Sequence, residues 1–115
     1  MGRRNRQRGK LAVPVTEYTD AEAGTLALRG SLTPGSRRDY TETLGGGLNR
    51  EDARQRATEL LFERLAVSWT VSGVKTSASR ELLGRYRMAS GPERAFVREA
   101  LRRHVEENFP DLQAP

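Results

Sequence analysis

The sequence predicts an α+β fold that is mainly helical, in which an N-terminal β-hairpin is followed by about four helices. Apolar residues alternate with other residues near the N-terminus, whereas from Ser31 onward they recur at helical spacing. The chain has 115 residues, enough for one modest hydrophobic core. We therefore expect residues 11–115 to form a single small globular domain, preceded by a disordered arginine-rich tail over residues 1–10.

Two alternating segments predict the hairpin. The first covers residues 11–15 and the second residues 25–28, and the residues from Thr19 to Gly24 between them are rich in turn formers. Pro14 has no N–H to donate, so we expect the first strand at an edge of the sheet or at a bulge.

Start and stop signals define the first two helices. Thr33 is a good N-cap residue before a proline, and it opens a short helix that ends at about Thr43. Three glycines, residues 45–47, then break the chain. Asn49, with Asp52 three residues later, opens the strongest helix of the sequence. β-branched residues and Gly73 are expected to end it near Trp69 to Ser72.

Two more helices follow. The third is expected to start after a cap at Ser77 or Ser79. Pro92 and Glu93 favour the start of the fourth, which ends before Phe109. Apolar residues recur at helical spacing in both: Leu82, Leu83, Tyr86 and Ala89 in the third, and Phe96, Val97, Ala100, Leu101, His104 and Val105 in the fourth.

The helix that begins at Asn49 has two apolar sides. One is formed by Ala53, Ala57, Leu60, Leu61 and Leu65, and the other by Phe62, Ala66 and Trp69. Phe62 and Trp69 are seven residues apart and would stack two turns along the same side. This second side either packs under the hairpin or forms an exposed apolar patch for a protein partner or for self-association.

The composition excludes several kinds of chemistry. The chain has no Cys and one His, so it has no thiol nucleophile, no disulfide and no imidazole cluster for a metal. His104 lies on the apolar side of the last helix, where we expect a packed structural histidine. We therefore expect no catalytic residue, cofactor, metal or small-molecule substrate. No apolar run is long enough to cross a membrane, and we expect a cytoplasmic protein.

The basic charge is concentrated at the N-terminus. Residues 1–10 carry five basic and no acidic side chains, while residues 11–115 carry 15 of each. Such a tail either contacts the phosphates of a nucleic acid or keeps a neutral domain soluble. Its basic residues are Arg3, Arg4, Arg6, Arg8 and Lys10.

The last two helices are joined by a short connection around Ser90 to Pro92, as in a helix-turn-helix. Arg94, Arg98 and Arg102 then form a basic stripe, four residues apart, along the second helix. The alternative is that glutamates neutralise this face through ordinary i,i+4 ion pairs, for example between Arg102 and Glu106.

The chain also resembles a known family. The residues that carry the resemblance are Leu26-Ala27-Leu28-Arg29, Leu32-Thr33-Pro34 with Arg37 and Arg38, the segment from Leu61 to Trp69, and Glu81-Leu82-Leu83. This pattern is similar to the small tail assembly chaperones of actinobacterial phages and prophages, over about residues 25–110. The resemblance implies a protein that binds the hydrophobic tape-measure protein and is not an enzyme. It would place Phe62, Leu65 and Trp69 on the protein-binding face.

Two functions are therefore predicted. The first is a non-enzymatic phage or prophage assembly protein that binds a protein partner, or itself, through the apolar helix face. The alternative is a small nucleic-acid-binding regulator of a phage or mobile element, which uses the N-terminal tail and the possible helix-turn-helix. The tail favours this alternative, because the chaperone family is not associated with such a segment.

Overall fold

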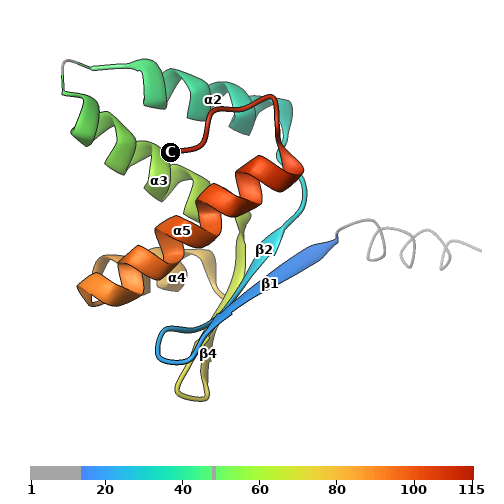
Figure 1. Ribbon diagram of the computed structural model, residues 1–115, viewed down its shortest axis with the longest axis vertical. Coiled ribbons are helices and arrows are strands. Elements are labelled where there is room, and N and C mark those ends of the chain that lie inside the picture. Colours follow the sequence, from blue (N-terminus) through green and yellow to red (C-terminus); the bar gives the residue numbers. More distant parts are fainter. Residues whose placement is uncertain (1–13, 48) are drawn as a thin grey trace, which may run out of the picture.

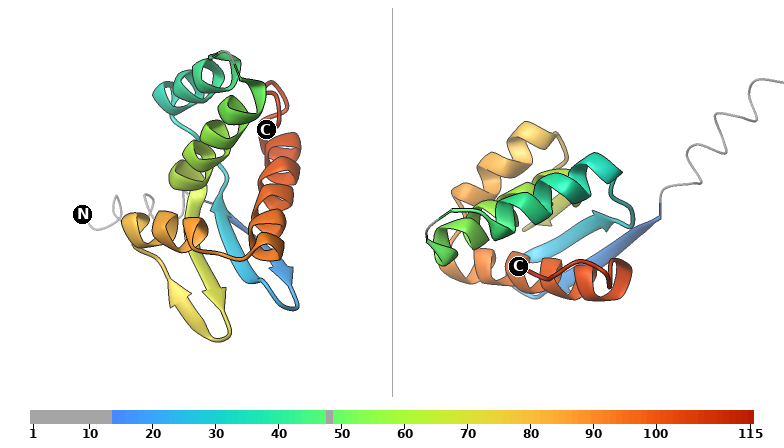
Figure 2. Two further views of the ribbon diagram at one scale, coloured as in Figure 1. Left: turned by 90° about the vertical axis from the view of Figure 1, so that its left-hand side faces the viewer. Right: turned by 90° about the horizontal axis from the view of Figure 1, so that it is seen from above.

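The computed structural model describes residues 14–47 and 49–115. In this part of the chain a four-stranded antiparallel sheet, with strand order β1-β2-β3-β4, packs on one face against α3, α4 and α5, and α2 packs on α3 (Figures 1 and 2). The elements are β1 (Val15–Asp20), β2 (Gly24–Arg29), α2 (Pro34–Gly45), α3 (Arg50–Leu65), β3 (Ala66–Val71), β4 (Val74–Thr76), α4 (Ser79–Arg87) and α5 (Gly91–Asn108).

The predicted α+β class and the excess of helix are confirmed, since 54% of the described residues are helical and 21% are in strands. The predicted arrangement is wrong, however, because the strands are not confined to an N-terminal hairpin. A second hairpin, β3 and β4, lies between α3 and α4. The predicted disordered tail, residues 1–10, lies outside the described residues.

The second strand of the predicted hairpin is confirmed as β2, whereas the first strand, β1, begins at Val15 and continues past the predicted range; residues 11–13 lie outside the described residues. The carboxylate of Asp20 accepts hydrogen bonds from the N–H groups of Glu22 and Ala23, at 3.0 and 2.9 Å, so the turn is tight and β1 continues to Asp20. The two N–H groups hold the pKa of Asp20 below its usual value. Gly24 has a positive φ of 92°, and a Cβ there would lie 2.0 Å from the carbonyl oxygen of Thr70 on β3.

Both predicted caps of the first two helices are present. The Thr33 hydroxyl accepts from the N–H of Ser36 at 3.0 Å, and the side-chain oxygen of Asn49 accepts from the N–H of Asp52 at 3.0 Å. The chain beyond α5 returns along these helices: the Tyr40 hydroxyl donates to the carbonyl oxygen of Gln113, and Arg37 pairs with Asp111 at 2.9 Å. Burial raises the pKa of Tyr40.

α3 ends four residues before Trp69, so the prediction of a helix as far as Trp69 is wrong. Ala66 already has an extended conformation, and the β-branched residues that follow form β3, which pairs with β2. Ser72 and Gly73 both have positive φ and close a two-residue hairpin turn to β4. Trp69 therefore lies on a strand and not on a helix face.

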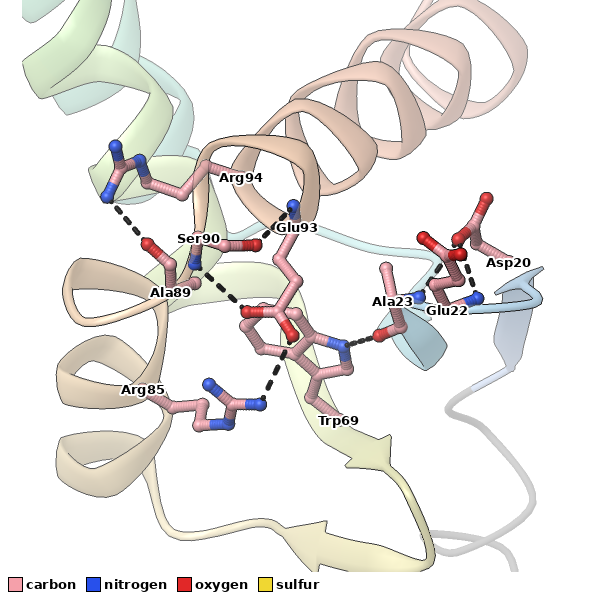
Figure 3. Close-up of polar contacts among 9 residues, drawn as sticks. All are labelled: Asp20, Glu22, Ala23, Trp69, Arg85, Ala89, Ser90, Glu93 and Arg94. Carbon is pink, nitrogen blue, oxygen red and sulfur yellow. Dashed lines mark hydrogen bonds and ion pairs between the residues drawn. The ribbon is translucent and has the colours of Figure 1, made fainter.

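Of the two alternatives for the Phe62 and Trp69 side chains, the structure shows the buried one and not the exposed patch on which the predicted protein-binding face depends. Phe62, Leu65 and Trp69 are fully buried between the sheet and the helices. The ring of Phe62 meets that of Trp69 edge-on at 6.1 Å and stacks on Tyr86 at 5.2 Å. The indole N–H of Trp69 donates to the carbonyl oxygen of Ala23 at 2.8 Å (Figure 3). These side chains hold the core together and offer no free surface to a partner.

α4 and α5 have different starts. Ala78 precedes α4 and supplies no side-chain cap, so the predicted cap at Ser77 or Ser79 is wrong. At the start of α5, Ser90 and Glu93 form a capping box: the N–H of Glu93 donates to the Ser90 hydroxyl at 3.2 Å, and the N–H of Ser90 donates to the Glu93 carboxylate at 3.0 Å (Figure 3). The predicted end of α5 before Phe109 is confirmed.

Candidate functional site

An open groove of about 490 Å³ runs between α3, α4 and α5. We call it the arginine groove, because four arginines line it. Its lining residues are Glu51, Arg54, Gln55, Thr58 and Glu59 from α3, Tyr86 and Arg87 from α4, and Arg94 and Arg98 from α5.

Helical spacing explains why these side chains meet. The α3 residues at positions 51, 54, 55 and 58 lie on one side of that helix, while Ala57 and Leu61 face the core. Arg94 and Arg98 are four residues apart on α5, so they lie one turn apart on the same face. The groove is therefore a product of regular helix surfaces and needs no loop.

The groove is basic although the described chain is neutral. Four arginines and two glutamates give its lining a formal charge of +2. The other described residues carry 11 basic and 13 acidic side chains, which is a formal charge of −2. The net positive charge of the groove lining therefore favours the approach of an anion.

Two buried residues form the floor of the groove. The Thr58 hydroxyl donates to the carbonyl oxygen of Arg54 at 2.8 Å, so its hydrogen is already used within α3. Tyr86 stacks on Phe62 of the core. The floor thus rests on the aromatic cluster of the core.

Two of the four arginines are paired with glutamates of the groove. Arg87 donates to the carboxylate of Glu59 at 2.7 Å, and this hydrogen bond and the charge of Glu59 raise the pKa of Arg87. Arg54 lies 3.4 Å from Glu51. Such exposed pairs are weak and can open when a stronger anion arrives.

The other two arginines have no carboxylate partner in the described part of the chain. Arg94 donates to the carbonyl oxygen of Ala89 at 2.8 Å, which ties it to the end of α4 (Figure 3). The Arg98 side chain is exposed and makes no ion pair with any described residue. Because neither guanidinium is paired with a described carboxylate, both charges, and the donor fork of Arg98, are available to an external anion.

Arg102, the third residue of the predicted stripe, is not part of this site. Its guanidinium lies between Glu99 and Glu106, with the Glu106 contact at 3.0 Å. The hydrogen bond and charge of Glu99, with a smaller effect of Glu106, raise the pKa of Arg102. The structure thus divides the stripe: Arg94 and Arg98 line the groove, and Arg102 is neutralised locally, as the i,i+4 alternative predicts.

The short connection predicted between the last two helices is present as three residues, 88–90, and Figure 3 shows how it is fixed. Arg94 reaches back to Ala89, and Arg85 lies over the Trp69 ring at 5.1 Å with Glu93 at 3.7 Å. α4, the connection and α5 are therefore held as one unit. Arg94 and Arg98 face α3 across the groove, which is a different arrangement from a recognition helix that projects alone.

The only histidine is buried, as expected for a structural residue. Its Nε2 lies 2.9 Å from the carbonyl oxygen of Arg29, which can only accept, so Nε2 carries the hydrogen. Its Nδ1 accepts from the Tyr18 hydroxyl at 2.9 Å and lies 3.2 Å from the amide nitrogen of Asn108. Burial, with the nearby charge of Glu107, raises the pKa of Tyr18. His104 joins α5 to the first hairpin and does not reach the groove.

No group of three or more His, Asp or Glu side chains in residues 14–47 and 49–115 is arranged to hold a metal ion. Within the same part of the chain, no helix has the length and apolar character needed to cross a membrane.

Sequence reasoning missed Arg54 and Arg87. Arg54 lies on the polar side of α3, where the sequence gives no reason to separate it from other exposed arginines. Arg87 is in the last turn of α4, a usual position for a basic residue. Only the packing of the three helices brings them beside Arg94 and Arg98. The other predicted nucleic-acid-binding residues, Arg3, Arg4, Arg6, Arg8 and Lys10, lie outside the described residues.

Comparisons of the chain with protein-family models, with curated proteins and with solved structures gave no match.

Proposed function

We propose that this protein is a non-catalytic nucleic-acid-binding protein that holds a phosphate backbone in the arginine groove. The observation that carries the proposal is the meeting of four arginines from three helices in one open groove on an otherwise neutral to acidic body. Phosphate groups are the anions that such a set of guanidinium groups suits best, because each guanidinium offers two parallel donors.

The N-terminal tail strengthens this proposal by its composition. It adds five basic side chains before the first strand. A tail and a groove that bind the same nucleic acid act together, because the second contact is then intramolecular. Since each phosphate contact contributes about −0.9 to the salt slope on duplex DNA, the tail adds at most about −4.5 and Arg94 with Arg98 about −1.8.

The protein-binding role implied by the resemblance to tail assembly chaperones stays a prediction. Burial of Phe62, Leu65 and Trp69 removes the surface on which it depended. The groove supports the second of the two predicted functions better, because its charge is available in the folded chain.

The test is fluorescence anisotropy of labelled duplex DNA and of a labelled RNA hairpin with the full chain, at two salt concentrations. We expect the double variant Arg94→Gln with Arg98→Gln to lose about tenfold or more in affinity at physiological salt and to flatten the salt slope by about 1.8. Comparison of the two probes shows whether DNA or RNA is preferred.

The matched control is Arg102→Gln with Arg103→Gln, which removes the same charge from the same helix. Arg102 is neutralised by glutamates, and Arg103 lies over the ring of Tyr18, away from the groove. We expect the control to bind almost as the unaltered chain does. Equal losses in both double variants would contradict the proposal, and so would binding that neither variant weakens.

A further inference from the structure

Met88 is an exposed apolar side chain in the connection between α4 and α5. Its exposed fraction is 85%, the largest among the big apolar residues of the described chain. A single exposed apolar residue needs no explanation by itself. The position of Met88 beside the arginine groove, however, suggests a role for this exposed side chain.

The backbone that carries Met88 is rigid. The N–H of Met88 donates to the carbonyl oxygen of Gly84 at 3.0 Å, and the N–H of Ala89 donates to that of Tyr86 at 3.1 Å. Ser90 is fixed by the capping box, and Ala89 is buried. The side chain therefore projects from a fixed point, and little backbone entropy would be lost if a ligand covered it.

Both chain neighbours of Met88 are connected to the groove. Arg87 lines it directly, and the carbonyl oxygen of Ala89 accepts the hydrogen bond from Arg94 (Figure 3). The backbone of Met88 thus lies close to the end of the groove where α4 meets α5. Phosphates held by Arg87 and Arg94 would therefore lie near the connection that carries Met88.

We propose that Met88 is a wedge that inserts between stacked base pairs of duplex DNA held by the arginine groove. This inference rests on the proposed function. Proteins that bend DNA insert apolar side chains, methionine among them, between base steps, and cations that hold the phosphates accompany them. Methionine suits this use because it is unbranched and polarisable, and because covering it removes apolar surface from water.

The experiment is energy transfer between dyes at the two ends of a short DNA duplex, which increases when the duplex bends. The full chain, at a concentration that saturates binding by anisotropy, should raise the transfer. Met88→Ala should still bind with the same salt dependence, but the increase in transfer should be lost.

Val74→Ala is the matched control. Val74 is the next most exposed large apolar residue, at 68%, and lies in the second hairpin outside the groove lining. It should bend DNA as the unaltered chain does. Both substitutions are at exposed positions, so both variants should keep their fold.

The outcomes separate the two proposals. Failure of the unaltered chain to bind duplex DNA would contradict the proposed function on duplex DNA and the wedge together. Binding without bending, or bending that Met88→Ala leaves unchanged, would overturn the wedge alone. Loss of bending in Val74→Ala as well would also overturn it, because the effect would then not belong to Met88.

Discussion

The two halves of α5 differ in whether their groove-side or neighbouring arginines are paired with carboxylates. In the first half, Arg94 and Arg98 face the arginine groove without a carboxylate partner in the described chain. In the second half, Arg102 lies between Glu99 and Glu106. The charges of Arg94 and Arg98 are available to a ligand, and that of Arg102 is compensated within the helix. The number of arginines on a helix therefore says less about binding than their position relative to carboxylates.

The two halves of α5 also differ in what their buried sides contact. The second half carries His104, whose ring joins the Tyr18 hydroxyl and the carbonyl oxygen of Arg29 to α5. The first half begins at the capping box and supports the connection to α4. We infer that the second half mainly attaches α5 to the sheet, while the first half contributes Arg94 and Arg98 to the lining of the groove.

The largest effect expected from this division is on stability. His104→Ala leaves the carbonyl oxygen of Arg29 and the hydroxyl of Tyr18 without their partner and opens a cavity in the core. We expect the free energy of unfolding to fall by about 3 kcal/mol. Urea denaturation followed by circular dichroism measures this change.

Arg98→Ala is the control from the first half of the helix. Because Arg98 is exposed and makes no ion pair with a described residue, its removal should change the free energy of unfolding by no more than about 0.5 kcal/mol. Similar losses in the two variants would show that the division of α5 into an anchoring and a binding half is wrong.

Much of α5 could be predicted from the sequence because its determinants are local. Pro92 and Glu93 favour its start, and the spacing of Val97, Ala100 and Leu101 predicts its buried side. The prediction failed at β3 because Trp69 falls at a helical distance from Phe62, so the apolar period does not change at Leu65. The β-branched residues after it indicated the end of a helix, but the strand they form depends on pairing with β2, far away in the sequence.

The candidate site was predictable only in part, for a similar reason. Arg94 and Arg98 could be chosen from their spacing on a single helix. Arg54 and Arg87 join them through the packing of α3 and α4 against α5, which no local pattern contains. The local neutralisation of Arg102 was open in the sequence, because both a basic stripe and i,i+4 pairs fit the same residues.

A smaller effect is expected at the start of α5. Ser90→Ala removes the hydroxyl that accepts from the N–H of Glu93, and it should lower the free energy of unfolding by about 1 kcal/mol. Ser79→Ala is the control, because α4 has no side-chain cap and Ser79 is exposed. Thermal denaturation of both variants measures the difference. If the two melt alike, the capping box does not stabilise the half of α5 that carries the groove.

The smallest expected effect tests whether Glu99 and Glu106 alone keep Arg102, in the second half of α5, from binding phosphate. Glu99→Gln with Glu106→Gln frees the guanidinium of Arg102, which lies one turn beyond Arg98 on α5. We expect affinity for duplex DNA to rise by about threefold, the size of a lost surface ion pair, and the salt slope to steepen by about 0.9 for one added phosphate contact. The control, Glu22→Gln with Glu42→Gln, removes the same charge from two exposed side chains that form no ion pair with a described residue. An equal rise in both variants would mean that net charge sets the affinity, and the position of Arg102 on α5 would then be irrelevant to binding.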